Sequence, residues 1–224
     1  MNTTADGALF LSLEDFAAWD RGLRSGAILP AESWAQIHAP VRLNSGKTYP
    51  YGFGWFVDMA NGDPWYQHSG HSQGFAIYIS RYLADDLTIV VLTNLVDADP
   101  SRFVDGIAAI LDPALAKIRP STQIPDADPA LAERVRGLLG AVADGKLRLQ
   151  EMHEPSRSLV ELVRGYAEVL HPLGELQRLE LLDRRELGDD RVSTYAAHFG
   201  SRTLRVQIAL TQDDRIADLY IEPE

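Results

Sequence analysis

Residues 65–75 have the sequence WYQHSGHSQGF, and this segment decides how the first half of the chain is interpreted. It places two histidines, two serines and two glycines between aromatic residues. A strand-like run lies on either side, YGFGWFVDM before it and FAIYISRYL after it. Imidazoles and hydroxyls are groups that carry out acid–base and nucleophilic catalysis. The segment is therefore the first candidate for a functional site.

The composition excludes several classes of protein. The chain has 224 residues, 46% of them hydrophobic, which is enough for one large domain or two ordinary ones. Its net charge of −11 argues against a nucleic-acid partner, because phosphate binding needs clustered Lys and Arg. The absence of cysteine excludes disulfides and thiol nucleophiles. With neither a signal-peptide pattern nor a long apolar run, we expect a soluble protein without a membrane partner.

Hydrophobic periodicity predicts a first domain at residues 1–117. Amphipathic helices are expected at 12–26, where Ser12 and Asp15 form a capping-box pattern, and at 30–40 between prolines. The period then changes to that of strands, with NGD at 61–63 as a tight turn and LTIVVLTNL at 87–95 as the last strand. A helix is expected at 100–115. These elements predict an antiparallel meander with flanking helices.

Residues 118–127 have the composition of a linker, and a second domain is predicted at 128–224. Two amphipathic helices are followed by four strand candidates, and Leu204, Val206, Ile208 and Leu210 alternate with other residues in one of them. We expect an α+β fold with helices on a four-stranded antiparallel sheet. It weakly resembles cystatin-like or nuclear-transport-factor-like accessory domains. The overall fold class is thus α/β to α+β.

Four segments in order resemble the C-terminal half of serine β-lactamase-like hydrolases, the group of class C β-lactamases and penicillin-binding esterases. They are GALFLSLEDFAAW, YGFGWFV, HSGHSQGF and IVVLTNL. The resemblance runs from about residue 5 to about residue 113. It implies hydrolysis of an ester, amide or β-lactam of a small molecule through an acyl-serine, without a metal or organic cofactor. Relatives are often exported, so the resemblance leaves the compartment open.

By this resemblance, His68-Ser69-Gly70 is the third sequence motif of the family. His68 would place an imidazole near the substrate, and Gly70 would let the substrate lie against the strand. The backbone N–H of His71 would be one donor of the oxyanion hole. These residues would form one wall of the active site.

The nucleophile motif of the family, Ser-x-x-Lys, does not occur in this sequence. The residues three positions before Lys47, Lys117 and Lys146 are Asn44, Ala114 and Ala143. A Tyr-x-Asn-like motif is also absent from the first domain. We therefore expect the chain to be inactive alone. The alternative is a non-catalytic binding or assembly module that retains the same wall.

Other interpretations of the histidine segment stay open at this stage. His68 and His71 could form part of a zinc site, although no third ligand is evident. Ser69 or Ser72 could act as a nucleophile, although His68 and Ser69 should point to opposite faces of a strand. The same polar residues could also simply form a turn. A metal site is not predicted.

The strand at 87–95 is apolar on both faces, which is typical of a strand in the interior of a sheet. In the family, its far edge pairs with strands of the N-terminal half. An unpaired apolar edge is a template for association. We expect this edge to be covered by a second copy of the chain, in a homo-oligomer, or by a complementing N-terminal half.

Overall fold

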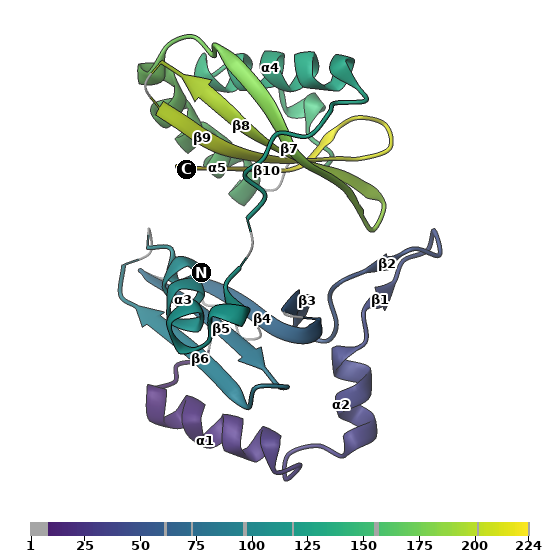
Figure 1. Ribbon diagram of the computed structural model, residues 1–224, viewed down its shortest axis with the longest axis vertical. Helices are drawn as coiled ribbons and strands as arrows, with labels where there is room; N and C mark the ends of the chain where they lie inside the picture. Colours follow the sequence, from purple (N-terminus) through teal and green to yellow (C-terminus); the bar gives the residue numbers. More distant parts are fainter. Residues whose placement is uncertain are drawn as a thin grey trace. The chain divides into compact units, whose positions relative to one another are not determined.

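The computed structural model describes residues 9–60, 62–72, 74–95, 98–117, 119–154, 157–200 and 202–223. The chain divides into two compact units, residues 1–118 and 119–224 (Figure 1). Asn61 of the expected NGD turn, Ile118 of the expected linker and the first eight residues lie outside the described residues. Each unit is described by itself.

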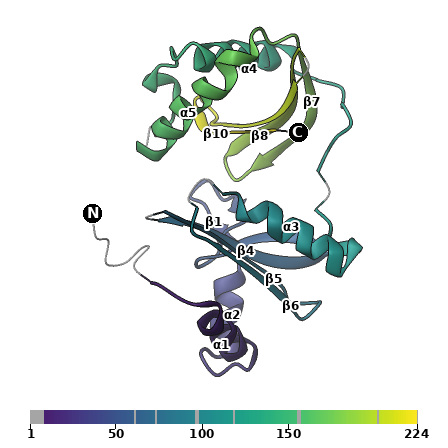
Figure 2. The same cartoon turned by 90° about the vertical axis from the view of Figure 1, so that its left-hand side faces the viewer.

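The first unit is built on a four-stranded antiparallel sheet of order β3-β4-β5-β6. Its elements are α1 (Leu13–Arg24), α2 (Ala31–His38), β1 (Val41–Arg42), β2 (Thr48–Tyr49), β3 (Phe56–Ala60), β4 (Asp63–Ser72), β5 (Phe75–Tyr82), β6 (Leu87–Thr93), α3 (Pro100–Leu111) and a 3₁₀ turn at Pro113–Leu115. Figure 2 shows α3 on one face of this sheet and α1 and α2 on the other. The predicted meander and its flanking helices are therefore present.

Alternation along the strands gives the sheet two separate apolar layers. Trp65, Tyr78 and Ile89 pack with Val104 and Ala108 of α3. On the opposite face, the cluster consists of buried Trp55, Tyr66 and Ile79, packed with Phe16, Trp19, Ile37, Val57 and Val90. Consecutive strand residues point to opposite faces, so one strand contributes to both layers. The sheet is thus covered on both sides by helices of its own unit.

Helix α1 begins where its sequence predicts. The Ser12 side chain accepts a hydrogen bond from the Asp15 N–H, and the Asp15 carboxylate accepts one from the Ser12 N–H. This reciprocal pair satisfies two backbone donors that the first turn of a helix leaves without partners. The chain leaves the helix through Gly26, which has φ +69°.

One expected strand begins later than predicted, and one expected helix ends earlier. Residues 51–55 do not belong to strand β3, because the chain turns through Gly54 at φ +80° before pairing begins at Phe56. Helix α3 ends at Leu111, and Pro113 starts a separate 3₁₀ turn because proline cannot continue the hydrogen-bond pattern of the helix.

A buried ion pair fastens α1 to the sheet. Arg81 on β5 is 2% exposed, and its Nε donates to Asp20 Oδ1 at 3.0 Å. Thr88 on β6 and Arg24 donate to the same carboxylate. Burial by itself would raise the pKa of Asp20, but these hydrogen bonds and the charge of Arg81 lower it below its usual value. The guanidinium also lies over the Trp55 ring, at 5.8 Å from its centroid.

The second unit packs its helices on one face of a sheet of order β10-β9-β8-β7. Its elements are α4 (Pro129–Ala143), α5 (Arg157–Leu170), β7 (Arg178–Leu187), β8 (Asp190–Phe199), β9 (Arg202–Leu210) and β10 (Ile216–Pro223), with 3₁₀ turns at Leu149–Glu151 and His171–Leu173. The alternating Leu204, Val206, Ile208 and Leu210 all enter the core. The predicted helices and four antiparallel strands are confirmed. The likeness to cystatin-like or nuclear-transport-factor-like domains stays a prediction.

The segment expected to be a linker is held against the second sheet. Arg119 pairs with Glu222 of β10, and the Pro120 carbonyl accepts from Arg205 of β9. The Ile124 N–H donates to the Leu181 carbonyl of β7, and Asp126 then pairs with Arg184 of the same strand. Residues 119–126 therefore form a strap that crosses from β10 to β7 before α4 begins.

Within the described residues, no helix has the length and apolar character needed to cross a bilayer.

The last residue of α2, His38, stacks on Tyr66 of β4 with ring centroids 3.8 Å apart. Its Nε2 is buried without a hydrogen-bond partner. Burial, and then the positive charge of Arg81, lower the pKa of His38 from 6.5 to about 4. The folded first unit therefore keeps this ring neutral at pH values where the unfolded chain would protonate it.

His38 should make the first unit sensitive to mild acid. Between pH 7 and pH 5 the unfolded state gains a proton that the folded state does not, so stability should fall with pH by about 1–2 kcal/mol after discounting for partial solvent access. In His38→Phe, which keeps a flat ring on Tyr66, this part of the loss should disappear. All four tryptophans lie in the first unit, so urea unfolding followed by tryptophan fluorescence measures it. Equal losses in both proteins would contradict the assignment.

Candidate active site

Strand β4 is longer than its neighbour β3, and this difference creates the candidate site. The two strands pair from Ala60↔Asp63 to Phe56↔Gln67. On its other side β4 pairs with β5 all the way to Ser72. Residues 68–72, HSGHS, therefore have one strand edge that no other described strand covers. Unpaired backbone N–H and C=O groups along such an edge are available to bind a ligand or an extended chain.

The residues of this edge alternate between the two faces of the sheet. His68 and Gly70 lie opposite Ile79 and Ile77 of β5, on the face that carries α1 and α2. Ser69 and His71 lie opposite Tyr78 and Ala76, on the α3 face. His68, Gly70 and His71 thus lie along one strand edge, and the backbone places the two imidazoles on opposite faces of the sheet.

Both nitrogens of His68 have hydrogen-bond partners. Nδ1 lies 2.6 Å from the carbonyl oxygen of Ser69, and Nε2 lies 2.9 Å from the hydroxyl oxygen of Tyr51. The ring also lies near Phe56, with centroids 5.9 Å apart. These contacts fix the ring at the open end of β4, where pairing with β3 stops.

Tyr51 reaches His68 from the loop at residues 51–55, YGFGW. The Gly52 N–H donates to the Trp55 carbonyl at 2.7 Å, and the Phe53 N–H donates to the Ile37 carbonyl of α2 at 2.9 Å. A Cβ built on Gly52 would lie 1.9 Å from the Ile37 carbonyl oxygen. Only glycine allows this approach of backbone to backbone. The loop is therefore pressed onto the end of α2, and this placement directs Tyr51 toward β4.

Gly70 has a packing role in addition to the one that the resemblance implies. A Cβ at this position would lie 3.0 Å from Cγ1 and 3.2 Å from Cδ1 of Ile77. The direction of the missing side chain is thus occupied by the isoleucine across the strand pair. Glycine keeps this part of β4 flat, which is also what a ligand lying along the edge would need.

The alternative chemistries receive no structural support. Within residues 62–72 and 74–95, no hydrogen bond joins a histidine to the hydroxyl of Ser69 or Ser72. Among the described residues, no group of three His, Asp or Glu side chains could hold a metal ion. The zinc pair of His68 and His71 thus gains no third ligand there.

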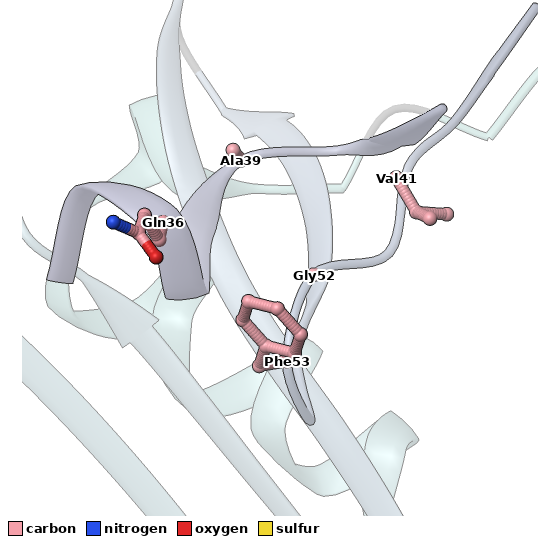
Figure 3. A pocket seen from close by; sticks show the side chains of 5 residues that line it. All are labelled: Gln36, Ala39, Val41, Gly52 and Phe53. Atoms are coloured by element: carbon pink, nitrogen blue, oxygen red, sulfur yellow. The ribbon is translucent and has the colours of Figure 1, made fainter. Parts of the chain in front are cut away.

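A shallow depression of about 350 Å³ lies beside the loop at 51–55 (Figure 3). It is lined by Gln36, Ala39, Val41, Gly52 and Phe53, so it sits over the end of α2. None of the residues of the β4 edge lines it. We therefore locate the candidate site at the strand edge and not in this depression.

Comparison with known proteins is consistent with the resemblance in the sequence. The family model described as Beta-lactamase matches residues 1–114, half of the chain. The chain therefore belongs to the β-lactamase family, a family of serine hydrolases. The matched region contains all elements of the first unit up to the end of α3.

Two curated relatives extend this finding. A D-aminopeptidase of Gluconobacter oxydans (strain 621H) is 28% identical over 165 residues, which are 72% of this chain and 30% of the relative. Penicillin-binding protein 4* of Bacillus subtilis (strain 168) is 30% identical over 90 residues, which are 40% of this chain and 20% of the relative. The matched regions thus span less than a third of the length of either relative.

Tyr51 is a residue of the site that no sequence motif marked, because Tyr51-Gly52-Phe53 does not fit a Tyr-x-Asn pattern. The available signal was the pair of glycines that follows, since YGFG specifies a tight loop with one close backbone approach and one positive φ. Such a loop fixes the direction of the residue before it.

Gly52→Ala should disrupt this loop. The added methyl would collide with backbone and not with a movable side chain, so we expect a loss of about 2–3 kcal/mol or more in the stability of the first unit. Gly54→Ala is the matched control, because nothing lies within 4 Å of its Cβ position and only the strain of φ +80° applies, about 1–2 kcal/mol. Urea unfolding followed by tryptophan fluorescence measures both. A smaller loss for Gly52→Ala than for Gly54→Ala would contradict the close approach.

Proposed function

We propose that this chain supplies one wall of the active site of a serine hydrolase, and that hydrolysis requires a further polypeptide segment that carries the nucleophile. The observation that carries the proposal is the open β4 edge with the sequence HSGHS, in a chain whose 224 residues contain no Ser-x-x-Lys. The substrate class would be an ester, an amide or a β-lactam. This class comes from the family, and the particular substrate is not assigned.

In this proposal each residue of the edge has one role. The serine oxygen of the added segment attacks the substrate carbonyl, its proton passes to a base of that segment, and the leaving group departs from an acyl-serine that water then hydrolyses. His68 faces the bound substrate, and the N–H of His71 donates to the developing oxyanion. Gly70 lets the substrate lie along β4. No metal or organic cofactor is needed for this chemistry.

The first unit also carries a surface suited to binding the further segment. Strand β6 is at the edge of the sheet and contains no charged residue. Next to it, α3 buries Val104 and Ala108 but exposes an apolar stripe, with exposed fractions of 60% for Phe103, 83% for Ile110 and 60% for Leu111. A stripe of this kind beside a free strand edge is typical of an interaction surface. We call the β6 edge and this stripe the β6–α3 surface.

The occupant that best fits the β6–α3 surface is a strand followed or preceded by an apolar helix. The strand would extend the sheet beyond β6, and the helix would pack on the stripe. Since the matched regions span less than a third of the length of the relatives, a complementing part of the same family fold is the occupant we propose. A second copy of the chain is the competing occupant.

Hydrolysis assays test the proposed function directly. The chain alone should neither turn over a chromogenic ester or cephalosporin nor react with a fluorophosphonate label. Coexpression with the part of the Gluconobacter oxydans D-aminopeptidase outside the matched region should restore both signals, and His68→Ala should abolish the turnover again. Labelling of the chain alone would contradict the proposal, as would a purified complex that shows no activity.

The β6–α3 surface gives a second prediction. The chain alone should self-associate at micromolar concentration through this surface, and Ile110→Glu should shift association by tenfold or more, because it removes a buried apolar contact worth about 1.5–3 kcal/mol. Leu149→Glu, at a residue 55% exposed in the second unit, is the control. Sedimentation velocity measures both. A wild-type chain that stays monomeric would contradict the role of the β6–α3 surface in association. Association that survives Ile110→Glu would show that another surface is responsible.

A further inference from the structure

The hydrogen bonds of His68 determine where its protons are. A carbonyl oxygen only accepts, so Nδ1, 2.6 Å from the Ser69 oxygen, must carry a hydrogen. In the neutral ring Nε2 then has no hydrogen and can only accept. Its partner at 2.9 Å is the Tyr51 hydroxyl, which must therefore donate. The opposite neutral tautomer would set a nitrogen lone pair against the Ser69 carbonyl.

Backbone and ring contacts hold Tyr51 in position for this hydrogen bond. Its ring packs edge-on against Phe56 at 4.6 Å between centroids, and its backbone forms a bridge with the same residue. Its carbonyl accepts from the Val41 N–H at 2.9 Å, and the loop behind it is fixed by Gly52 on α2. Backbone and ring contacts thus fix the hydroxyl at the start of the β4 edge.

We propose that Tyr51 is a ligand-contacting residue of the site: the Ser69 carbonyl sets the Nδ1–H tautomer of His68, the Tyr51 hydroxyl occupies Nε2, and the phenolic oxygen becomes the part of the pair that meets a ligand. The binding of a ligand at this pair rests on the proposed function. The positions of the protons on His68 and Tyr51 do not depend on it. With both nitrogens engaged, the neutral imidazole has no free donor or acceptor. The Tyr51 oxygen still has lone pairs that can accept from a ligand N–H or O–H.

The pair can also reverse its polarity. When His68 takes up a second proton, that proton sits on Nε2, and Nε2–H donates to the Tyr51 oxygen. The phenolic hydrogen is then released from His68 and can donate to a ligand carbonyl or carboxylate. The proton comes from the solvent, the only bond formed is Nε2–H, the Tyr51 O–H bond stays intact, and the only charge added is that of the imidazolium.

Among the groups around His68, Tyr51 is the one whose hydrogen-bonding role changes when His68 is protonated. The ring contacts Tyr51 and Phe56 from the segment before β4 and the backbone carbonyl of Ser69, and Ile79 of β5 lies opposite His68 in the strand pair. Tyr51 is the titratable one among them, and within the described residues no ion pair includes His68. Toward a ligand, the hydroxyl of Tyr51 is thus the switchable contact of the edge: its oxygen accepts while His68 is neutral, and its O–H donates when the ring is protonated.

Nuclear magnetic resonance of the ¹⁵N-histidine-labelled full chain tests the proposal without any activity. In wild type, neutral His68 should carry its hydrogen on Nδ1, its Nε2 signal should be displaced by a hydrogen bond, and a slowly exchanging Tyr51 hydroxyl proton should show a cross-peak to the His68 ring. His68→Gln identifies the signals among the six histidines.

Tyr51→Phe keeps the ring packing and removes only the hydroxyl. We expect Nδ1 to stay protonated, the Nε2 signal to move to the position of a free ring nitrogen, and the hydroxyl signal to vanish. Phe53→Leu, in the same loop and 71% exposed, should change none of these, and tryptophan fluorescence checks that each variant is folded. An unchanged Nε2 signal in Tyr51→Phe, or a wild-type neutral ring protonated on Nε2, would overturn the proposal. Failure of the hydrolysis assays alone would leave this result intact and count against the proposed function only.

Discussion

The arrangement of the candidate site depends on one close contact, between the backbone of Gly52 and the carbonyl of Ile37 at the end of α2. The approach leaves no room for a Cβ, so the loop at 51–55 lies directly on the helix. The loop in turn sets where β3 begins and where Tyr51 points. Because pairing starts only at Phe56, the end of β4 is left uncovered and His68 gains its phenolic partner.

Helix α2 is in turn held by the sheet it covers. His38 stacks on Tyr66, and Arg81 lies beneath this region in a pair with Asp20 of α1. A buried guanidinium is tolerated because a carboxylate satisfies it. Burial, and then the charge of this guanidinium, lower the pKa of the nearby His38 and keep its imidazole uncharged. His38 is the last residue of α2, and the loop at 51–55 lies on the same end of this helix, so both belong to one packed layer. The contacts of this layer hold the loop that positions Tyr51 at the strand edge.

Much of the fold could be predicted from the sequence because local signals and periodicity agree there. Ser12 and Asp15 mark a helix start by direct hydrogen bonding, and the alternation from Leu204 to Leu210 marks a half-buried strand. That HSG lies on a strand was expected from the family resemblance, but the uncovered edge of this strand was not. Tyr51 was missed because its partner is 17 residues away and meets it only through a glycine contact with α2. Residues 119–126 were taken for a linker because prolines and polar residues hide their long-range ion pairs to the sheet.

That strap has a practical meaning for any attempt to isolate the second unit. A truncated chain starting at 128, where composition suggests a boundary, would lose the contacts that Arg119, Pro120 and Asp126 make with Glu222, Arg205 and Arg184. It would also strip the Ile124 backbone from the edge of β7 and leave that strand ready to pair with another molecule. The smallest self-contained version of this domain should therefore begin no later than Arg119.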